Sequence, residues 1–309
     1  MKTLNNISAS SLIETLASRL QSEQNTGWVK LQNKIASTEA FEPKAFFFIF
    51  AICSRWFSKA ASTLSLEQNS IEKKPELETE SNVHYIRMDK DENTWSWVDV
   101  ARVYLLLLLW QRNDSESYQQ TYRDLYHSAD VKESILLIKS LAFLPDTEAF
   151  ISIAREAARS NITSLFSAIA HNNDYPMRYF DMSGWNQLIL KAAFLAVPIW
   201  SIVGLKQRNN AALAEMLSDY ARERQLASRS VPWDLWCCVG WSASTTQDLA
   251  ALEKQFEQGD KQIKAAIALS LIENNDGEAH ALGNRMAKQM HFTKTHSVPD
   301  TWQEIATIS

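Results

Sequence analysis

The side chains that most often carry chemistry are few in this sequence, and their spacing predicts neither a catalytic nor a metal site. The six histidines share no metal-ligand spacing, so surface histidines are the simpler interpretation. The three cysteines are odd in number, and the adjacent Cys237 and Cys238 follow Trp236 in an apolar setting, which favours inert buried thiols. No serine-hydrolase, zinc-protease, dinucleotide or phosphate-loop pattern occurs in the sequence. We therefore predict a protein that is not an enzyme and that needs no cofactor and no metal.

Carboxylate pairs at helical spacing occur in the sequence, and Glu215 with Asp219 is an example. Glu215 and Asp219 are four residues apart, with Arg222 beside them. A catalytic pair needs a cleft that perturbs its pKa values, whereas helical spacing next to a cation is typical of a solvated helix face. We predict the solvated face.

Residues 171–240 differ from the rest, because large aromatic side chains alternate there with amides and charges on helices that otherwise look buried. Gln187 and Lys191 are four apart and share a helix face, as do Tyr220 and Arg224, with Glu223 adjacent. A buried polar group without a partner costs about 1–3 kcal/mol. Two interpretations stay open: a structural network that ties helices together, or a pocket that offers amide and guanidinium donors to a small molecule with an apolar body.

The pocket interpretation places the site on a concave face formed by residues 173–236, with tyrosine and tryptophan rings as apolar contacts and the polar residues as donors to an anionic or carbonyl group. The candidate ligand-binding residues are Tyr175, Tyr179, Trp185, Asn186, Gln187, Lys191, Arg208, Tyr220, Glu223, Arg224, Arg229 and Trp236.

Composition limits the partners. The chain has 309 residues, of which 46% are hydrophobic, and its net charge is −5 with scattered cations, so we expect no nucleic-acid partner. The N-terminus is not a secretory signal, and the cysteine usage suits a reducing compartment, so a cytoplasmic location is expected.

The apolar runs 46–57 and 103–110 are shorter than the roughly 20 residues of a spanning helix. Buried core helices are the leading interpretation; the alternative is membrane-surface contact through Phe46, Phe47, Phe48 and Phe50.

The elements that must position these residues are helices, because glycine and proline number only seven each and apolar residues recur at helical spacing. In the first part we predict helices over 8–24, with a capping box from Ser11 to Glu14, over 28–35, and from Pro43 onward. A charged linker or loop over 63–92 contains the only plausible strand, a weak one at 83–88.

From residue 94 onward the predicted helices follow one another closely. Thr94, Asp130, Asp146 and Ser183 are the predicted caps. Pro198 interrupts the helix after Ser183, and Gly204 marks a turn. The first predicted helix of this part runs from Thr94 through the leucine run 103–110, another follows Ser160-Asn161 and ends at His171, and another runs from Ser183 to the interruption at Pro198. The other predicted helices are 116–126, 130–142, 147–159, 207–227, 245–257, 261–273 and one from 277 to 288.

Helices of this length joined by short polar turns are typical of helical hairpins of the HEAT class. The predicted fold is therefore all-α: stacked antiparallel helical hairpins in a HEAT-like α-α superhelix, with a compact, non-repetitive bundle as the alternative. The predicted organisation is N-terminal helices over 1–62, the charged linker over 63–92, a helical-repeat domain over 93–291 with a core at 171–240, and a C-terminal tail over 292–309.

The core region also resembles a known family. The matching elements stand in order along about 70 residues, and the helix with Ala101 and Arg102 matches more loosely, while the first 90 residues contribute little. The elements are Asn173 with Tyr175-Pro176, Tyr179-Phe180, Trp185-Asn186-Gln187, Leu190-Lys191-Ala192, Phe194, Gly204-Leu205, Arg208, Asn210, Tyr220, Glu223-Arg224, Arg229, Val231-Pro232, Trp236 and Val239-Gly240. In these elements the chain resembles the EboA family of bacterial metabolite-traffic proteins.

The resemblance implies a role in a secondary-metabolite gene cluster. Such clusters also encode a UbiA-like membrane prenyltransferase and other enzymes, and are associated with export of a scytonemin precursor toward the periplasm. The resemblance thus implies an accessory protein that binds a metabolite and passes it on, with proteins of the ebo-type cluster as partners and peripheral attachment at the inner membrane as an alternative to a purely cytoplasmic location. The rival hypotheses are a scaffold that binds partner enzymes only, and an unrecognised enzyme acting on a prenylated or aromatic intermediate.

Overall fold

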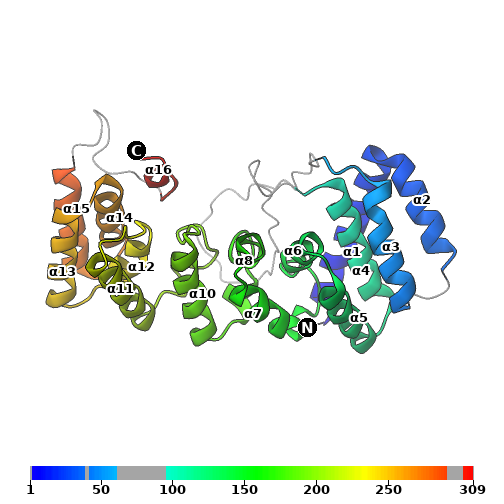
Figure 1. The fold of residues 1–309 in the computed structure, drawn as a ribbon, viewed down its shortest axis with the longest axis horizontal. Helices are drawn as coiled ribbons and strands as arrows, with labels where there is room; N and C mark the ends of the chain where they lie inside the picture. The colour runs from blue at the N-terminus through cyan, green and yellow to red at the C-terminus, as the bar shows by residue number, and fades with distance from the viewer. Residues whose placement is uncertain (1, 39–41, 61–94, 291–301, 309) are drawn as a thin grey trace. The chain divides into compact units, whose positions relative to one another are not determined.

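A computed structural model describes residues 2–38, 42–60, 95–290 and 302–308, with the side chains of the first helix described from Ala9 onward. Within these ranges the chain forms sixteen α-helices and one 3-10 helix and contains no β-strand (Figure 1). The all-α prediction is confirmed, and the HEAT-like arrangement stays a prediction. The linker 63–92 and its strand 83–88 lie outside the described residues. The longer helices are α1 (Lys2–Glu23), α2 (Asn25–Ala36), α3 (Pro43–Trp56), α4 (Trp97–Arg112), α5 (Ser115–Ser128), α6 (Val131–Ser140), α7 (Ile151–Arg159), α8 (Thr163–Ala170), α10 (Met182–Leu195), α11 (Ala211–Leu226), α12 (Leu235–Ser242), α13 (Thr246–Gln258), α14 (Lys261–Ile272) and α15 (Gly277–Gln289).

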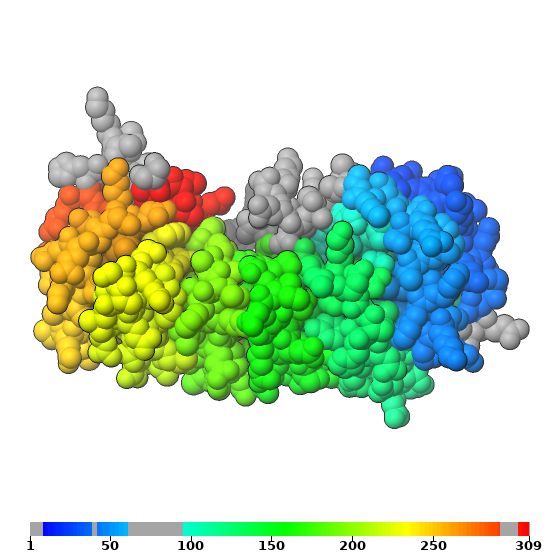
Figure 2. All heavy atoms as spheres, viewed as in Figure 1, coloured from blue at the N-terminus to red at the C-terminus, as the bar shows by residue number. Residues whose placement is uncertain are grey.

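The helices gather into two compact units, residues 1–175 and residues 176–309. Three elements are short. The 3-10 helix η1 (Thr147–Phe150) lies in the first unit, α9 (Tyr175–Tyr179) starts at the division, and α16 (Trp302–Ala306) lies in the second unit. Within each unit most helices pack against the next helix or the next but one, so the colours follow the chain in bands (Figure 2). The division falls inside the predicted core region 171–240.

The first unit begins with four packed helices, in which α2, α3 and α4 follow one another and α1 contacts both α2 and α4. The inner face of α3 buries Phe46, Ile49 and Phe50. Helix α4 is buried on nearly every side, including Arg102, whose Nε donates to the Phe50 carbonyl at 3.2 Å. A helix with apolar residues all round is expected in the middle of a packed group.

The leading interpretation of a buried core helix is confirmed for Phe46 and Phe50, which are 0% exposed, so the alternative of a surface contact is wrong for these two residues. Phe47 is half-buried, and Phe48 alone is well exposed, at 54%. Residues 46 and 50 are four apart and share the inner face, whereas residue 48 lies on the opposite side of the helix.

The second unit is built from α9 to α16. Contacts run from α10 to α11, from α11 to α12, from α12 to α14 and from α14 to α15. The predicted breaks at residues 259–260 and 275–277 are confirmed, because Asp260 and Asp276 accept backbone N–H bonds as N-caps of α14 and α15. The predicted tail 292–309 contains α16, which packs on α14 through the buried Ile305.

Two predicted N-caps in the first unit are wrong. Helix α1 already begins at Lys2, so Ser11 lies inside it and cannot cap it. Asp146 adopts a left-handed backbone conformation, with φ 53°, and makes no capping bond; its Oδ2 accepts from Trp110 Nε1 at 3.1 Å instead. Asp130 does cap α6, in a capping box with Glu133.

Three other helix starts also differ from the prediction. Thr94 lies outside the described residues, and Ser96 caps α4 through a capping box with Asp99. Asp181 caps α10, which leaves Ser183 within the helix. The helix predicted from residue 207 begins at Ala211, because Asn210 accepts the Leu213 N–H and caps it.

Candidate functional site

The twelve candidate residues fall in both units. Tyr175 belongs to the first unit, where its ring is 0% exposed and its hydroxyl donates to the Thr147 carbonyl at 2.7 Å. Asn173 prepares this position, because its Oδ1 accepts the Tyr175 N–H while its Nδ2 donates to Ile138 and Ala168. These contacts are those of a structural tyrosine in the first unit. The other eleven candidates lie in the second unit.

Arg208 holds the start of the second unit together. Its NH1 group donates to the carbonyls of Pro176, Met177 and Phe180 at 2.8–3.1 Å, at the C-terminal end of the short helix α9. Its guanidinium also lies 4.9 Å from the Trp185 ring centre, so the cation stacks on an indole while it closes the helix end. Burial lowers the pKa of Arg208, and the nearby Asp181 raises it. The NH1 group of this guanidinium is therefore already hydrogen-bonded to the backbone of the second unit.

Asn186 and Asn210 form a reciprocal amide pair. Each Nδ2 donates to the other's Oδ1, at 3.2 Å and 2.9 Å, and Asn210 also caps α11. Asn186 is 5% exposed. The pair therefore joins α10 to the start of α11, and Asn186 serves the fold directly.

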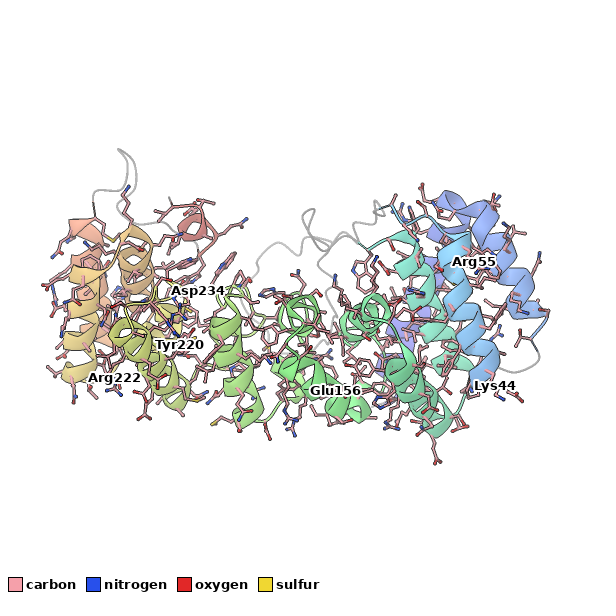
Figure 3. The ribbon with its side chains drawn as sticks, in the orientation of Figure 1. Lys44, Arg55, Glu156, Tyr220, Arg222 and Asp234 are labelled. Carbon is pink, nitrogen blue, oxygen red and sulfur yellow. The ribbon has the colours of Figure 1, made fainter. Side chains whose placement is uncertain are left out.

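Tyr220 and Arg224 share a face of α11, as the sequence predicts. The Tyr220 hydroxyl donates to the Ala193 carbonyl at 3.2 Å, and Arg224 NH1 donates to that hydroxyl at 3.2 Å. Arg224 Nε also donates to the Ser230 carbonyl in the segment after α11. Tyr220 and Asp234 are both labelled in Figure 3, on the second unit. The polar groups of Tyr220 and Arg224 thus join α10, α11 and the following loop.

The aromatic rings of this region are not all buried. Phe194, on α10, is 68% exposed, and its ring centre lies 5.1 Å from that of the buried Tyr220. The Arg224 guanidinium lies 5.6 Å from the same Tyr220 ring. We call Phe194, Tyr220 and Arg224 the aromatic–arginine surface; its Tyr220 ring contacts both the exposed Phe194 ring and the half-buried Arg224 cation.

Two buried indoles carry a polar atom without a hydrogen-bond partner. Trp185 is 0% exposed and Trp236 is 4% exposed, and neither Nε1 has an acceptor. Buried N–H groups are nearly always paired in folded proteins, so each of these donors is an unusual feature of the second unit.

The remaining candidates lie toward solvent. Gln187, Glu223 and Arg229 are exposed, and Tyr179 and Lys191 are half-buried. Lys191 stands three residues before Phe194 on α10, so the two share a helix face. The structure thus divides the candidates into residues whose side chains are buried and residues that are exposed or half-buried at the surface.

One functional-looking residue was missed by sequence reasoning. Asp234 is 6% exposed, and its Oδ2 accepts the backbone N–H groups of Ile199 at 2.6 Å and Trp200 at 3.4 Å. Burial raises the pKa of this carboxyl, and these two backbone donors lower it. The flanking Pro232-Trp233 and Leu235-Trp236 are the signal that this carboxyl would be buried.

The family is decided by comparison of the whole chain with known families. Residues 9–240 match the family described as metabolite traffic protein EboA. The chain belongs to the EboA family. The match begins in α1 and ends in α12, so it covers far more of the N-terminal half than the resemblance at residues 171–240 suggests. Neither curated proteins nor solved structures give a match to the chain.

All twelve candidates of this EboA protein lie inside the matched range, and the helices α13 to α16 lie beyond it.

Cys237 and Cys238 are buried as predicted, and burial raises the pKa of the Cys237 thiol well above its ordinary value. Glu215 and Asp219 are exposed as predicted, and Asp219 pairs with Arg222 at 2.8 Å. Among the described residues, no group of three or more His, Cys, Asp or Glu side chains is placed to hold a metal ion.

The geometry of this EboA protein suits non-covalent binding. The aromatic–arginine surface offers a ring face, a cation and hydroxyl-linked polarity within one pair of helices. Such a surface attracts an aromatic or apolar body that carries a carbonyl or anionic group.

Proposed function

We propose that this EboA protein is an accessory protein that binds a small-molecule intermediate of a secondary-metabolite pathway and helps to pass it toward export. Membership of the family supports a role in metabolite handling. No helix among the described residues is both long and apolar enough to cross a bilayer. The proposal places the chain in the cytoplasm, where a UbiA-like membrane prenyltransferase and other cluster proteins are its partners.

The observation that carries the proposal is the exposure of Phe194. A phenylalanine ring at 68% exposure leaves apolar area in water, which is unfavourable by about 25 cal/mol for each Å² that a ligand could cover. Its ring lies next to the Tyr220 ring, which also contacts Arg224, and Lys191 stands on the same helix face. An exposed ring bordered by cations favours a planar ligand with a negative or carbonyl edge.

The buried candidates have a different part in this proposal. Arg208, Asn186 and Trp185 hold α9, α10 and the start of α11 in place, and the surface residues Gln187, Lys191, Arg224 and Arg229 supply the contacts. Binding sites depend on such support, because contact residues bind well only when their own positions are held.

The test is binding of metabolites of the cluster to the purified chain, measured by calorimetry. Phe194→Ser and Arg224→Gln are expected to weaken binding about tenfold each, because they remove the ring and the cation from the surface. The matched control is Met182→Ser, since Met182 is 62% exposed at the start of the same helix. Asn186→Ala is a poor test, because it also breaks the amide pair that joins two helices. Unchanged affinity in both test variants, with unchanged helical content, would remove this surface from the site.

The second candidate function is a scaffold that binds pathway enzymes and no metabolite. It is favoured by the hydrogen bonds of Arg208, Asn186 and Tyr220, which go to other groups of the protein. A scaffold is expected to use polar groups in this way, because it binds no metabolite with them. Pull-down from native lysate separates the two functions. A stoichiometric protein partner with no copurifying small molecule supports the scaffold.

The third candidate, an enzyme acting on a prenylated or aromatic intermediate, has a direct test. Turnover of a pathway intermediate by the purified chain, lost on Glu223→Gln or Asp181→Asn, would support it. Asp181 caps α10, so loss of turnover in that variant counts only if its helical content is unchanged.

A further inference from the structure

The outer face of the α2–α3 pair is an apolar surface that the proposed function does not use. Helix α3 turns Phe46, Ile49 and Phe50 inward, and its opposite side carries Lys44, Phe48, Ala51 and Arg55, all exposed. Positions 44, 48, 51 and 55 follow helical spacing, so they form one stripe along the helix. Phe48 is 54% exposed.

The neighbouring helix extends this stripe. Val29 and Lys30 on α2 are exposed, with Val29 at 48%. Lys34 on α2 reaches toward α3, where its Nζ lies 5.2 Å from the centre of the Phe48 ring. The outer sides of the two helices therefore form one surface, which we call the Phe48 face: Val29, Lys30, Lys34, Lys44, Phe48, Ala51 and Arg55.

Cations surround the apolar centre of the Phe48 face. Lys44 and Arg55 lie near the two ends of α3 (Figure 3), and Lys30 and Lys34 stand on α2. Residues 25–60 contain five lysines and arginines and two carboxylates, whereas the whole chain has a net charge of −5. A locally positive surface on a chain of negative net charge attracts a negatively charged partner and orients the chain as the two approach.

We propose that the Phe48 face docks on the surface of an anionic lipid bilayer. Phe48 and Val29 enter the interfacial layer, while the four cations contact lipid phosphates, as in helices that lie along a membrane without crossing it. Long lysine and arginine side chains suit this arrangement, because their stems lie along apolar surface while their charges reach the headgroups. A protein partner fits less well, since lysine is depleted at protein interfaces and three of the seven residues of the Phe48 face are lysines.

This inference is independent of the metabolite site. The Phe48 face lies in the first unit, and the aromatic–arginine surface lies in the second. Binding to vesicles can therefore fail or succeed without affecting metabolite binding measured in solution, and the two failures are distinguishable.

The experiment is flotation of the full chain with vesicles of phosphatidylcholine containing 30 mol% phosphatidylglycerol, next to vesicles of phosphatidylcholine alone. The wild type is expected to float with the anionic vesicles, and raising the salt concentration to about 0.5 M is expected to release it. Phe48→Ser is expected to lower the bound fraction about tenfold. Lys44→Gln with Arg55→Gln is expected to lower it by about fivefold for each cation removed.

The control variant is Leu226→Ser, because Leu226 is an exposed apolar residue of the second unit, at 82% exposure. It is expected to bind vesicles as the wild type does. Circular dichroism checks that every variant keeps its helical content; Phe48, Lys44 and Arg55 are exposed, so their replacement leaves the packed face of α3 intact.

The proposal is overturned if the wild type floats with neither vesicle type, or if the Phe48 and cation variants bind as well as the wild type. It is also overturned if the face proves to be covered by a second copy of the chain, seen as a dimer that Phe48→Ser dissociates.

Discussion

At the scale of single residues, the second unit is held by polar side chains whose partners are mostly backbone atoms. Arg208 closes the end of α9, Asn186 pairs with the residue that caps α11, and Asp234 accepts two backbone N–H groups of the segment after α10. Each of these three residues joins segments that are separate along the chain. Each bond is therefore expected to contribute more to the position of a segment than to the size of the core.

Replacing Arg208 tests this role. Arg208→Ala is expected to lower the free energy of unfolding by about 2–3 kcal/mol, because the change removes the charged donor to three backbone carbonyls and the cation that stacks on the Trp185 ring. Arg208→Lys should lose less, since an ammonium group still stands at the helix end but lacks the planar donor edge. Urea unfolding followed by circular dichroism measures both. Arg222→Ala is the control: its side chain is 72% exposed, and its pair with Asp219 is worth less than about 1 kcal/mol. Equal losses at positions 208 and 222 would contradict the role.

Asp234 has a pH signature. Burial raises its pKa above the ordinary 3.8, so the folded protein keeps the proton to a higher pH than the unfolded chain does. Its stability contribution is therefore complete below about pH 3.8 and is lost as the pH rises through the folded pKa. Asp234→Asn keeps an oxygen that can accept the Ile199 N–H but carries no charge. We expect the variant to gain stability relative to wild type between pH 3.5 and pH 7.

The measurement is the difference in unfolding free energy between Asp234→Asn and wild type across that pH range. Asp234→Ala serves as the comparison, because it removes both the charge and the acceptor and should cost about 1–3 kcal/mol relative to the Asn variant at each pH. A difference between wild type and the Asn variant that does not change with pH would show that the folded pKa is not raised.

At the scale of elements, two helices of the second unit approach each other closely at a glycine. A Cβ atom placed on Gly240 would lie 1.8 Å from Ser270 Oγ and 2.5 Å from Ser270 Cβ. Gly240 lies on α12 and Ser270 on α14, and Ser270 is 0% exposed. The missing side chain thus lets the two helices touch.

Gly240→Ala is therefore expected to destabilise the chain by about 1–3 kcal/mol, because the added methyl group overpacks a closed contact. Gly277→Ala is the matched variant: Gly277 begins α15, and a Cβ there meets nothing within 4 Å. That change should be neutral or stabilise slightly, since alanine loses less backbone freedom on folding than glycine. Thermal unfolding of both variants compares them, and a Gly240→Ala protein as stable as Gly277→Ala would contradict the close contact.

At the scale of the whole molecule, the chain consists of two compact units, and the family match spans parts of both. The match stops at residue 240, yet α12 packs against α14, which lies beyond it. The core of the second unit is thus completed by helices outside the matched range. A segment cut at the end of the match would expose the face of α12 that α14 covers.

We expect residues 176–309 to fold alone, because the bonds of Arg208, Asn186, Tyr220, Arg224 and Asp234 all close within that range. The fragment should give a helical circular dichroism spectrum and a cooperative thermal transition. A fragment of residues 176–242, which lacks α13 to α16, should not, since the partner of α12 is missing. The expectation fails if the two fragments unfold alike.

The amino-acid sequence by itself determined the all-α fold, most helix positions and the family, because these depend on local periodicity, turn residues and an ordered set of residue types. Helical spacing also correctly placed Tyr220 with Arg224 on one face and Asp219 with Arg222 in water. Caps were predicted less well: Asp146 precedes η1 but has a left-handed backbone and makes no capping bond, and Ser183 lies inside α10, which Asp181 caps. Only the tertiary structure decided which polar groups of residues 171–240 face one another. Asn186 and Arg208 are bound by Asn210 and by the α9 carbonyls, and Phe194 and Phe48 are left in solvent, because partners and exposure depend on segments that are distant in sequence.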